Sequence, residues 1–179
     1  CEETTDEEGL SGAQRMSAEG AMDGVDYVIA QHVDPSKPVG TIGINAGPNS
    51  GGVDSWHAVI KGKGGHGAHP DKTIDPFYML AHVIMALNGI VSRRLNPFAP
   101  AVVSIGSIHG GFTENVIPEE VKITGTLRFT DESVHQQIHA EIKRAFEIVK
   151  VLGGDYEIKY EIGGPPMIND KYVSEVIEK

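Results

Sequence analysis

Two long amphipathic helical patterns constrain the fold of this 179-residue chain more than any other feature. The first runs over 75–93 and has Pro76 where a helix accepts proline, in its first turn. The second runs over 133–152 and is followed by Gly153, a typical C-terminal cap. Their apolar positions are Phe77, Leu80, Ile84, Leu87 and Val91 in the first, and Val134, Ile138, Ile142, Phe146 and Val149 in the second. Each pattern predicts a helix with one apolar face to bury.

Strand-like segments surround these helices in a regular order. They cover 53–61, 101–108, 121–129 and 156–162, and the middle two are joined through Gly110-Gly111. The resulting order, β-α-β-β-α-β, predicts an α+β fold, a ferredoxin-like sandwich of one sheet and two helices over 51–164.

The flanking segments have a different pattern. A helix is predicted over 11–22, and short strands over 26–33 and 40–45, the first with the apolar character of a buried parallel strand. The loop cluster Pro48–Gly52 is predicted to be a domain boundary, and Gly163–Pro166 a return linker before a further helix from Asp170.

Charge and composition exclude several classes of partner. The net charge is −10, which argues against nucleic acid or an anionic membrane as partner, and no apolar run reaches the length of a membrane span. The lone Cys1 cannot form an intrachain disulfide and fits a reducing, cytoplasmic compartment. Because the chain opens on Cys-Glu-Glu without an initiator Met, we expect it to be a piece of a longer protein.

A single histidine stands within a glycine-rich stretch that directly follows a strand-like run. Gly64, Gly65 and Gly67 flank His66, and glycines let a backbone come close to a ligand. The pattern is typical of a histidine held out on a slim tip, free to reach another surface. A flexible glycine-rich hairpin with an incidental histidine fits the spacing equally well.

Several motifs in a fixed order resemble one enzyme family. They are Asp6-Glu-Glu-Gly9, Gln31-His-Val33, Lys61-Gly-Lys-Gly-Gly-His-Gly-Ala68, Ile90-Val-Ser-Arg93, Asn115-Val-Ile-Pro118 and Gly125-Thr-Leu-Arg128. Together they closely resemble the dinuclear-metal amidohydrolases that include hippurate hydrolase, auxin-conjugate hydrolase and aminoacylase-like carboxypeptidases. One departure is local: many relatives carry Pro-His after the His-Gly-Ala segment, whereas here His69 precedes Pro70.

The resemblance implies a catalytic role for residues near the start of the chain. It makes 51–164 a lid and dimerisation domain, with 1–50 and 165–179 as pieces of an α/β metallohydrolase catalytic domain. It implies that Glu7 is the general base and that Glu8 and His32 bind metal. Glu2-Glu3 is a rival acidic pair, but the path through Gly9 to His32 fits only if Glu7 and Glu8 begin it.

The resemblance also assigns three residues of the lid. His66 and Asn115 are expected to hydrogen-bond the scissile carbonyl as it becomes an oxyanion, in many relatives from the opposite subunit of a homodimer. Arg128 is expected to hold the carboxylate of a small substrate, an N-acyl amino acid or dipeptide. His135 and His139 have helical i, i+4 spacing, but no nearby acid suits a site, and we interpret their face as solvated.

The resemblance further implies two divalent ions, zinc or manganese, in each complete active site. A catalytic zinc usually has three protein ligands, so Glu8 and His32 alone cannot complete a site. We therefore expect the isolated chain to be inactive and to bind metal weakly. The alternative is a non-catalytic dimerisation module whose exposed sheet edge pairs with a second copy.

Overall fold

The computed structural model describes residues 12–179, and the chain divides into two compact units, one up to Gly43 and one from Ile44 to Lys179. In the first unit, the described residues form a single helix, α1 (Gly12–Ala18), inside the segment where a helix was expected. None of its side chains is buried within this chain. Among the described residues, no helix is long and apolar enough to cross a membrane.

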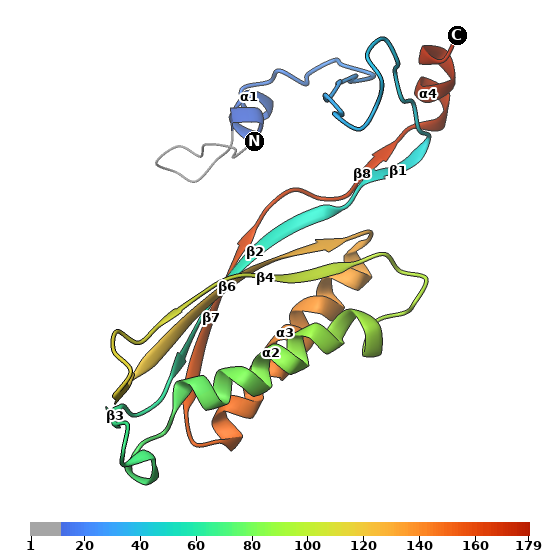
Figure 1. Cartoon of the computed structure of the whole chain (residues 1–179). Coiled ribbons are helices and arrows are strands. Elements are labelled where there is room, and N and C mark those ends of the chain that lie inside the picture. The colour runs from blue at the N-terminus through green and yellow to red at the C-terminus, as the bar shows by residue number, and fades with distance from the viewer. Residues whose placement is uncertain (1–11) are drawn as a thin grey trace. The chain divides into compact units, whose positions relative to one another are not determined.

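The second unit contains the predicted sandwich (Figure 1). Its helices are α2 (Pro76–Arg93), α3 (Glu132–Val151) and α4 (Lys171–Ile177), and a short 3₁₀ turn covers Pro70–Lys72. Its longer strands are β2 (Gly52–Lys61), β4 (Val102–Gly110), β6 (Glu120–Phe129) and β7 (Asp155–Ile162). Its shorter strands are β1 (Gly47–Ser50), β3 (Gly65–His66), β5 (Val116–Ile117) and β8 (Met167–Asn169).

The four longer strands form one antiparallel sheet in the order β4-β6-β2-β7. β2 is central: all ten of its residues pair with β6, and Asp54 to Lys61 also pair with β7. Figure 1 shows α2 and α3 side by side on one face of this sheet. The topology is that of the predicted ferredoxin-like sandwich, and the prediction is confirmed.

The core lies between the sheet and the two helices because both sets of elements are amphipathic. Along β2, buried and more exposed residues alternate, so that Trp56, Ala58 and Ile60 all face the helices. The Trp56 ring meets Phe146 of α3 edge to face, with centroids 6.1 Å apart. The helices begin at capping carboxylates: Asp75 accepts a hydrogen bond from the Phe77 N–H, and Asp131 from the Val134 N–H.

Two short ribbons were not expected from the sequence. β1 pairs with β8, so the segments that lead into and out of the sandwich run side by side, and β1 occupies part of the predicted loop 48–52. β3 pairs with β5 in a ladder of two residue pairs.

The strands predicted over 26–33 and 40–45 are wrong, because the structure has no strand there. A buried strand needs pairing partners and cover on both faces. Within the described residues neither segment pairs in a sheet, and Val28, Ile29 and Val33 are more than half exposed.

Substitution of Gly125 in β6 tests how tightly the sheet packs against Trp56. A methyl group at this position would collide with the Trp56 ring and with the carbonyl of Ser104, so Gly125→Ala should lower the free energy of unfolding by about 3 kcal/mol through overpacking. Gly89→Ala in α2 is the matched control. A methyl group there meets nothing within 4 Å, and the change should stabilise the helix by about 1 kcal/mol. Denaturant unfolding measures both, and equal effects of the two changes would contradict close packing of Gly125 against Trp56.

Candidate functional site

His66 and Asn115 lie next to each other at a tip beyond the end of the sheet (Figure 1). This tip is formed by β3, β5 and the turns beside them. His66 pairs with Val116 in the β3–β5 ladder, and the Gly67 N–H donates to the Asn115 carbonyl at 2.8 Å. The side chains of both His66 and Asn115 are exposed. The structure therefore brings together two of the three predicted lid residues.

The hydrogen bonding of the His66 ring fixes which nitrogen can donate. Its Nδ1 accepts from the Ala68 N–H at 3.1 Å, so the neutral ring carries its proton on Nε2. The His69 ring lies beside it, with centroids 5.7 Å apart. His66, an exposed residue, thus offers an Nε2–H donor, and the backbone of Asn115 lies against that of its neighbour Gly67.

Arg128 lies at the opposite end of the sheet. It pairs with Val53 at the start of β2, whereas Glu120, eight residues earlier in β6, pairs with Lys61 at the end that leads to the tip. At about 3.4 Å per residue, eight residues span roughly 27 Å. The Arg128 guanidinium donates to the Thr126 hydroxyl and to the Leu127 carbonyl. One copy of the sheet therefore cannot present Arg128 and His66 to the same small substrate.

Of the residues predicted to bind metal, only His32 is described, and it lies in the first unit. Glu7 and Glu8, like the rival pair Glu2-Glu3, lie outside the described residues. His32 is exposed and in irregular structure rather than at a strand end. Its Nδ1 lies 2.7 Å from the Val33 carbonyl. Because a carbonyl only accepts, Nδ1 carries the proton and Nε2 is left with a lone pair that suits a metal ion.

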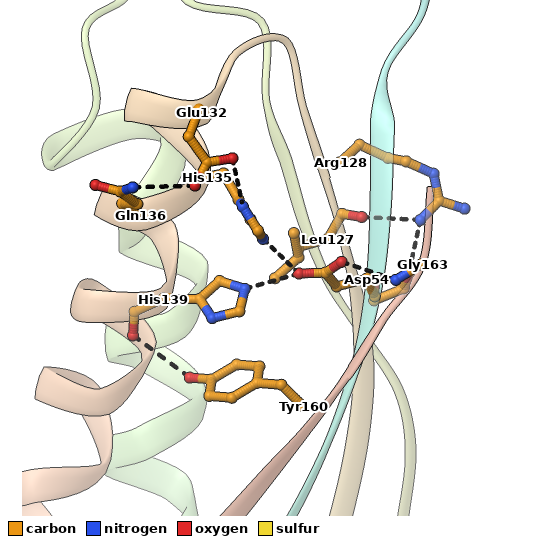
Figure 2. Close-up of polar contacts among 10 residues, drawn as sticks. Asp54, Leu127, Arg128, Glu132, His135, Gln136, His139, Tyr160 and Gly163 are labelled. Carbon is orange, nitrogen blue, oxygen red and sulfur yellow. Dashed lines mark hydrogen bonds and ion pairs between the residues drawn. The ribbon is translucent and has the colours of Figure 1, made fainter. Parts of the chain in front are cut away.

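Asp54, His135 and His139 form a polar cluster that the sequence analysis did not identify (Figure 2). Nε2 of His135 and Nε2 of His139 lie 2.6 Å and 2.8 Å from the same oxygen, Oδ2 of Asp54. The other carboxylate oxygen accepts from the Gly163 N–H at 3.0 Å. The interpretation of a solvated histidine face is wrong, because both rings pack against the sheet, His135 on Phe129 and His139 on Tyr160.

The cluster shifts the protonation of its members. Burial alone would raise the pKa of the Asp54 carboxyl. Hydrogen bonds from His135, the Gly163 N–H and His139 outweigh this effect, so the pKa of Asp54 is below its ordinary value. Burial would also lower the pKa of His135, but its hydrogen bonds to Asp54 and Glu132 raise it above the usual value. Both shifts favour a charge-assisted hydrogen bond between carboxylate and imidazolium.

One signal in the sequence could have found this cluster. Asp54 occupies an inward position of β2, in register with Trp56, Ala58 and Ile60, where an apolar residue is expected. A charged side chain in such a row needs a partner, and the two histidines of α3 have the spacing that places them on one helix face. Asp54 was overlooked as a partner because it lies 81 residues before His135 in the sequence.

Comparison with known proteins places this fold and these motifs in one group. A model of the peptidase dimerisation domain matches residues 50–151. An N-acetyl-L-cysteine deacetylase of Bacillus subtilis is 37% identical over 175 residues, which are 96% of this chain and 41% of the relative.

Two solved structures are also similar. One, from methicillin-resistant Staphylococcus aureus, has a TM-score of 0.85 and 33% identity, over 93% of this chain and 44% of that one. The other, a Bacillus subtilis protein described as a dinuclear metal binding peptidase, has a TM-score of 0.70 and 28% identity, over 93% and 43%. The chain thus spans about two fifths of the length of the proteins that it matches.

Replacement of Asp54 should destabilise the sandwich strongly. Asp54→Ala leaves two imidazoles and the Gly163 N–H without their acceptor, which should cost about 3 kcal/mol of unfolding free energy. Glu161→Ala is the control, because its 73% exposed side chain pairs with His57 on the open face and should cost less than about 0.5 kcal/mol. Urea unfolding at neutral pH distinguishes the two, and a near-neutral Asp54→Ala would show that the cluster contributes little.

Proposed function

This chain belongs to the peptidase dimerisation domain family, and from that premise we propose that it is part of a metal-dependent amidohydrolase. Its substrates would be N-acyl amino acids or small peptides, cleaved at the amide bond. The names of the deacetylase and of the dinuclear metal binding peptidase that resemble it support this reaction class. The observation that carries the proposal is the exposed Nε2–H donor of His66 beside Asn115.

The tip has the chemistry that amide hydrolysis requires of a donor pair. As water attacks an amide carbonyl, negative charge develops on the oxygen, and preorganised donors lower the barrier most when they point at that oxygen. The Nε2–H of His66 on β3 and the side-chain amide of Asn115, the residue before β5, are two such donors on neighbouring segments. In this mechanism, they hydrogen-bond the substrate carbonyl and hold it as the oxyanion forms.

The remaining machinery is assigned to the first unit. We propose that Glu8 and His32 bind metal and that Glu7 accepts a proton from the attacking water and returns it to the leaving amine. The His32 donor set fits a metal ion, because Nδ1 is engaged with a carbonyl and Nε2 is left to ligate. Two divalent ions, zinc or manganese, would supply a polarising charge that activates water. Glu8 and His32 are fewer than the usual three ligands, so this chain alone should be inactive.

The domain boundaries follow the same assignment. We propose that 51–164 form the lid and dimerisation domain, and that 1–50 and 165–179 belong to the catalytic domain. The β1–β8 ribbon supports this division, because it brings the entering and leaving segments together as an inserted domain requires.

The separation of Arg128 from the tip favours a dimer. One sheet cannot present both of its ends to one substrate. The pair His66 and Asn115 must therefore serve one active site, and Arg128 another. A homodimer satisfies this requirement when Arg128 binds the substrate carboxylate in its own subunit and His66 reaches the partner's active site. β4 supports dimer formation, because its outer edge has no pairing partner within the described residues.

Replacement of His66 tests the oxyanion role in the full-length protein. His66→Ala should lower kcat by about 100-fold with a much smaller effect on KM, since the lost hydrogen bond acts mainly in the transition state. His69→Ala is the matched control, because it removes the neighbouring imidazole and should leave kcat nearly unchanged. Steady-state kinetics with an N-acetyl amino acid provides the measurement.

The opposite outcome would favour the second candidate function. If His66→Ala retains full turnover, the tip serves packing alone, and the domain is a non-catalytic dimerisation module. The outer edge of β4, with which no strand of residues 12–179 pairs, and the exposed side chains of Tyr78 and Met85 on α2 are the features that favour this candidate.

Mixing two inactive variants tests whether the two ends of the sheet serve different sites. His66→Ala and Arg128→Ala should each be impaired alone. In a mixed dimer, the active site of the His66→Ala subunit has its own Arg128 and receives His66 from its partner. Random reassociation should therefore restore about a quarter of wild-type activity, because half the dimers are mixed and each has one intact site of two. If both residues acted within one subunit, or both in the partner, no mixed dimer would contain an intact site and activity would stay low.

A further inference from the structure

We propose that Asp54, His135 and His139 bind a divalent transition-metal ion of the zinc type, at a site separate from the catalytic ions. The three side chains come from β2 and α3 of the sandwich, whereas the proposed catalytic ligand His32 belongs to the first unit and Glu8 lies outside the described residues. The site would add a structural metal to the base of the lid.

The donor set and its spacing suit zinc. Imidazole nitrogen and carboxylate oxygen are common zinc ligands, and two histidines four residues apart project from one face of a helix. In the structure, both Nε2 atoms already converge on Asp54 Oδ2, and all three ligand atoms lie within 4.8 Å of one another. No loop has to fold to assemble the site, because both elements are held by the core.

Small movements would convert the cluster to metal geometry. With bonds of about 2.0 Å in a tetrahedron, neighbouring ligand atoms stand about 3.3 Å apart. The present separations from the carboxylate oxygen are 2.6 Å and 2.8 Å. The His135 and His139 imidazoles would therefore move away from the carboxylate oxygen by about 0.7 Å and about 0.5 Å, within the reach of side-chain torsions.

The surroundings orient the rings as a metal site requires. Ligation through Nε2 leaves the imidazole proton on Nδ1, which then needs an acceptor. For His135, that acceptor is present, since Nδ1 lies 3.3 Å from a Glu132 carboxylate oxygen (Figure 2). Stacking on Phe129 and Tyr160, with centroids 4.0 Å and 4.1 Å away, restricts the rotation of the two rings.

An ion could reach the site from one side. The Asp54 side chain is fully buried, but those of His135 and His139 are 14% and 23% exposed. A shallow pocket of about 430 Å³ opens beside His139. The three protein ligands would leave the fourth position of a tetrahedral ion to a water molecule.

The position of the site suggests what the ion would do. Asp54 Oδ1 accepts from the Gly163 N–H, and Val53 pairs with Gly163 and Gly164 just where the chain enters and leaves the sandwich. An ion held by Asp54 and α3 would tie both of these segments to the helix layer. We therefore expect metal to stabilise this end of the sandwich without taking part in the reaction.

Zinc titration of the chelator-stripped protein tests the proposal. The wild-type protein should bind one more Zn²⁺ than His139→Gln, because glutamine retains an N–H donor for Asp54 but removes the imidazole ligand. His82→Gln is the matched control, since it removes a single imidazole from the neighbouring helix α2 and should leave the number of bound ions unchanged. Circular dichroism checks that both variants remain folded.

Two further measurements test the proposal without relying on the Zn²⁺ count. Glu132→Gln keeps all three ligands but weakens the acceptor at His135 Nδ1, and should weaken zinc binding at this site by about 10-fold. Co²⁺ added to the wild-type protein should give an absorption band typical of tetrahedral coordination. His139→Gln, which keeps only two of the three ligands, should lack this band. Equal Zn²⁺ stoichiometry in wild-type protein and His139→Gln, with no difference in the Co²⁺ spectrum, would overturn the proposal and leave the cluster as a hydrogen-bonded clamp.

Discussion

The pairing of β2 with strands on both sides is the constraint on which the rest of the structure depends. β2 gives Trp56, Ala58 and Ile60 to the core, and it is held along its length by β6 and β7. Asp54 is the third residue of β2, and the chain that follows the last residue of β2 forms the tip with His66. One strand therefore determines the separation between the two candidate sites, because a strand paired on both sides can neither bend nor slip in register without exposing its buried face.

The fold of the sandwich was predictable because each of its main helices and strands has a signal within a short stretch of sequence. The 3.6-residue period of α2 and α3 and the strand segments between them each appear within a single window of sequence, and their order leaves few topologies. The β1–β8 and β3–β5 ribbons were not predictable, because two to four residues have no period to detect. The segment 26–33 was misinterpreted for a related reason: its apolar run favours a strand, but pairing is decided by partners that the run itself does not identify.

The candidate sites were predictable in proportion to how local their signals are. His66 stood out because the glycines around it are adjacent in sequence, and its proximity to Asn115 followed only from the family resemblance until the β3–β5 ladder placed them together. Arg128 was grouped with them by motif alone, and only the strand register separates it. Asp54 was missed since its partners lie far along the chain, although a carboxylate in an apolar row is a physical anomaly that one sequence can reveal.

The glycines around His66 serve close packing rather than flexibility, which bears on the alternative of an incidental histidine. A methyl group on Gly64 would lie 2.7 Å from the Ile117 carbonyl, and one on Gly67 would lie 3.1 Å from that of Asn115. The tip is also fixed by two hydrogen bonds of 2.9 Å between the backbones of Lys63 and Ile74. A flexible hairpin would need none of these contacts. An oxyanion donor needs all of them, because a hydrogen bond that must strengthen in the transition state is effective only when its donor is held in position beforehand.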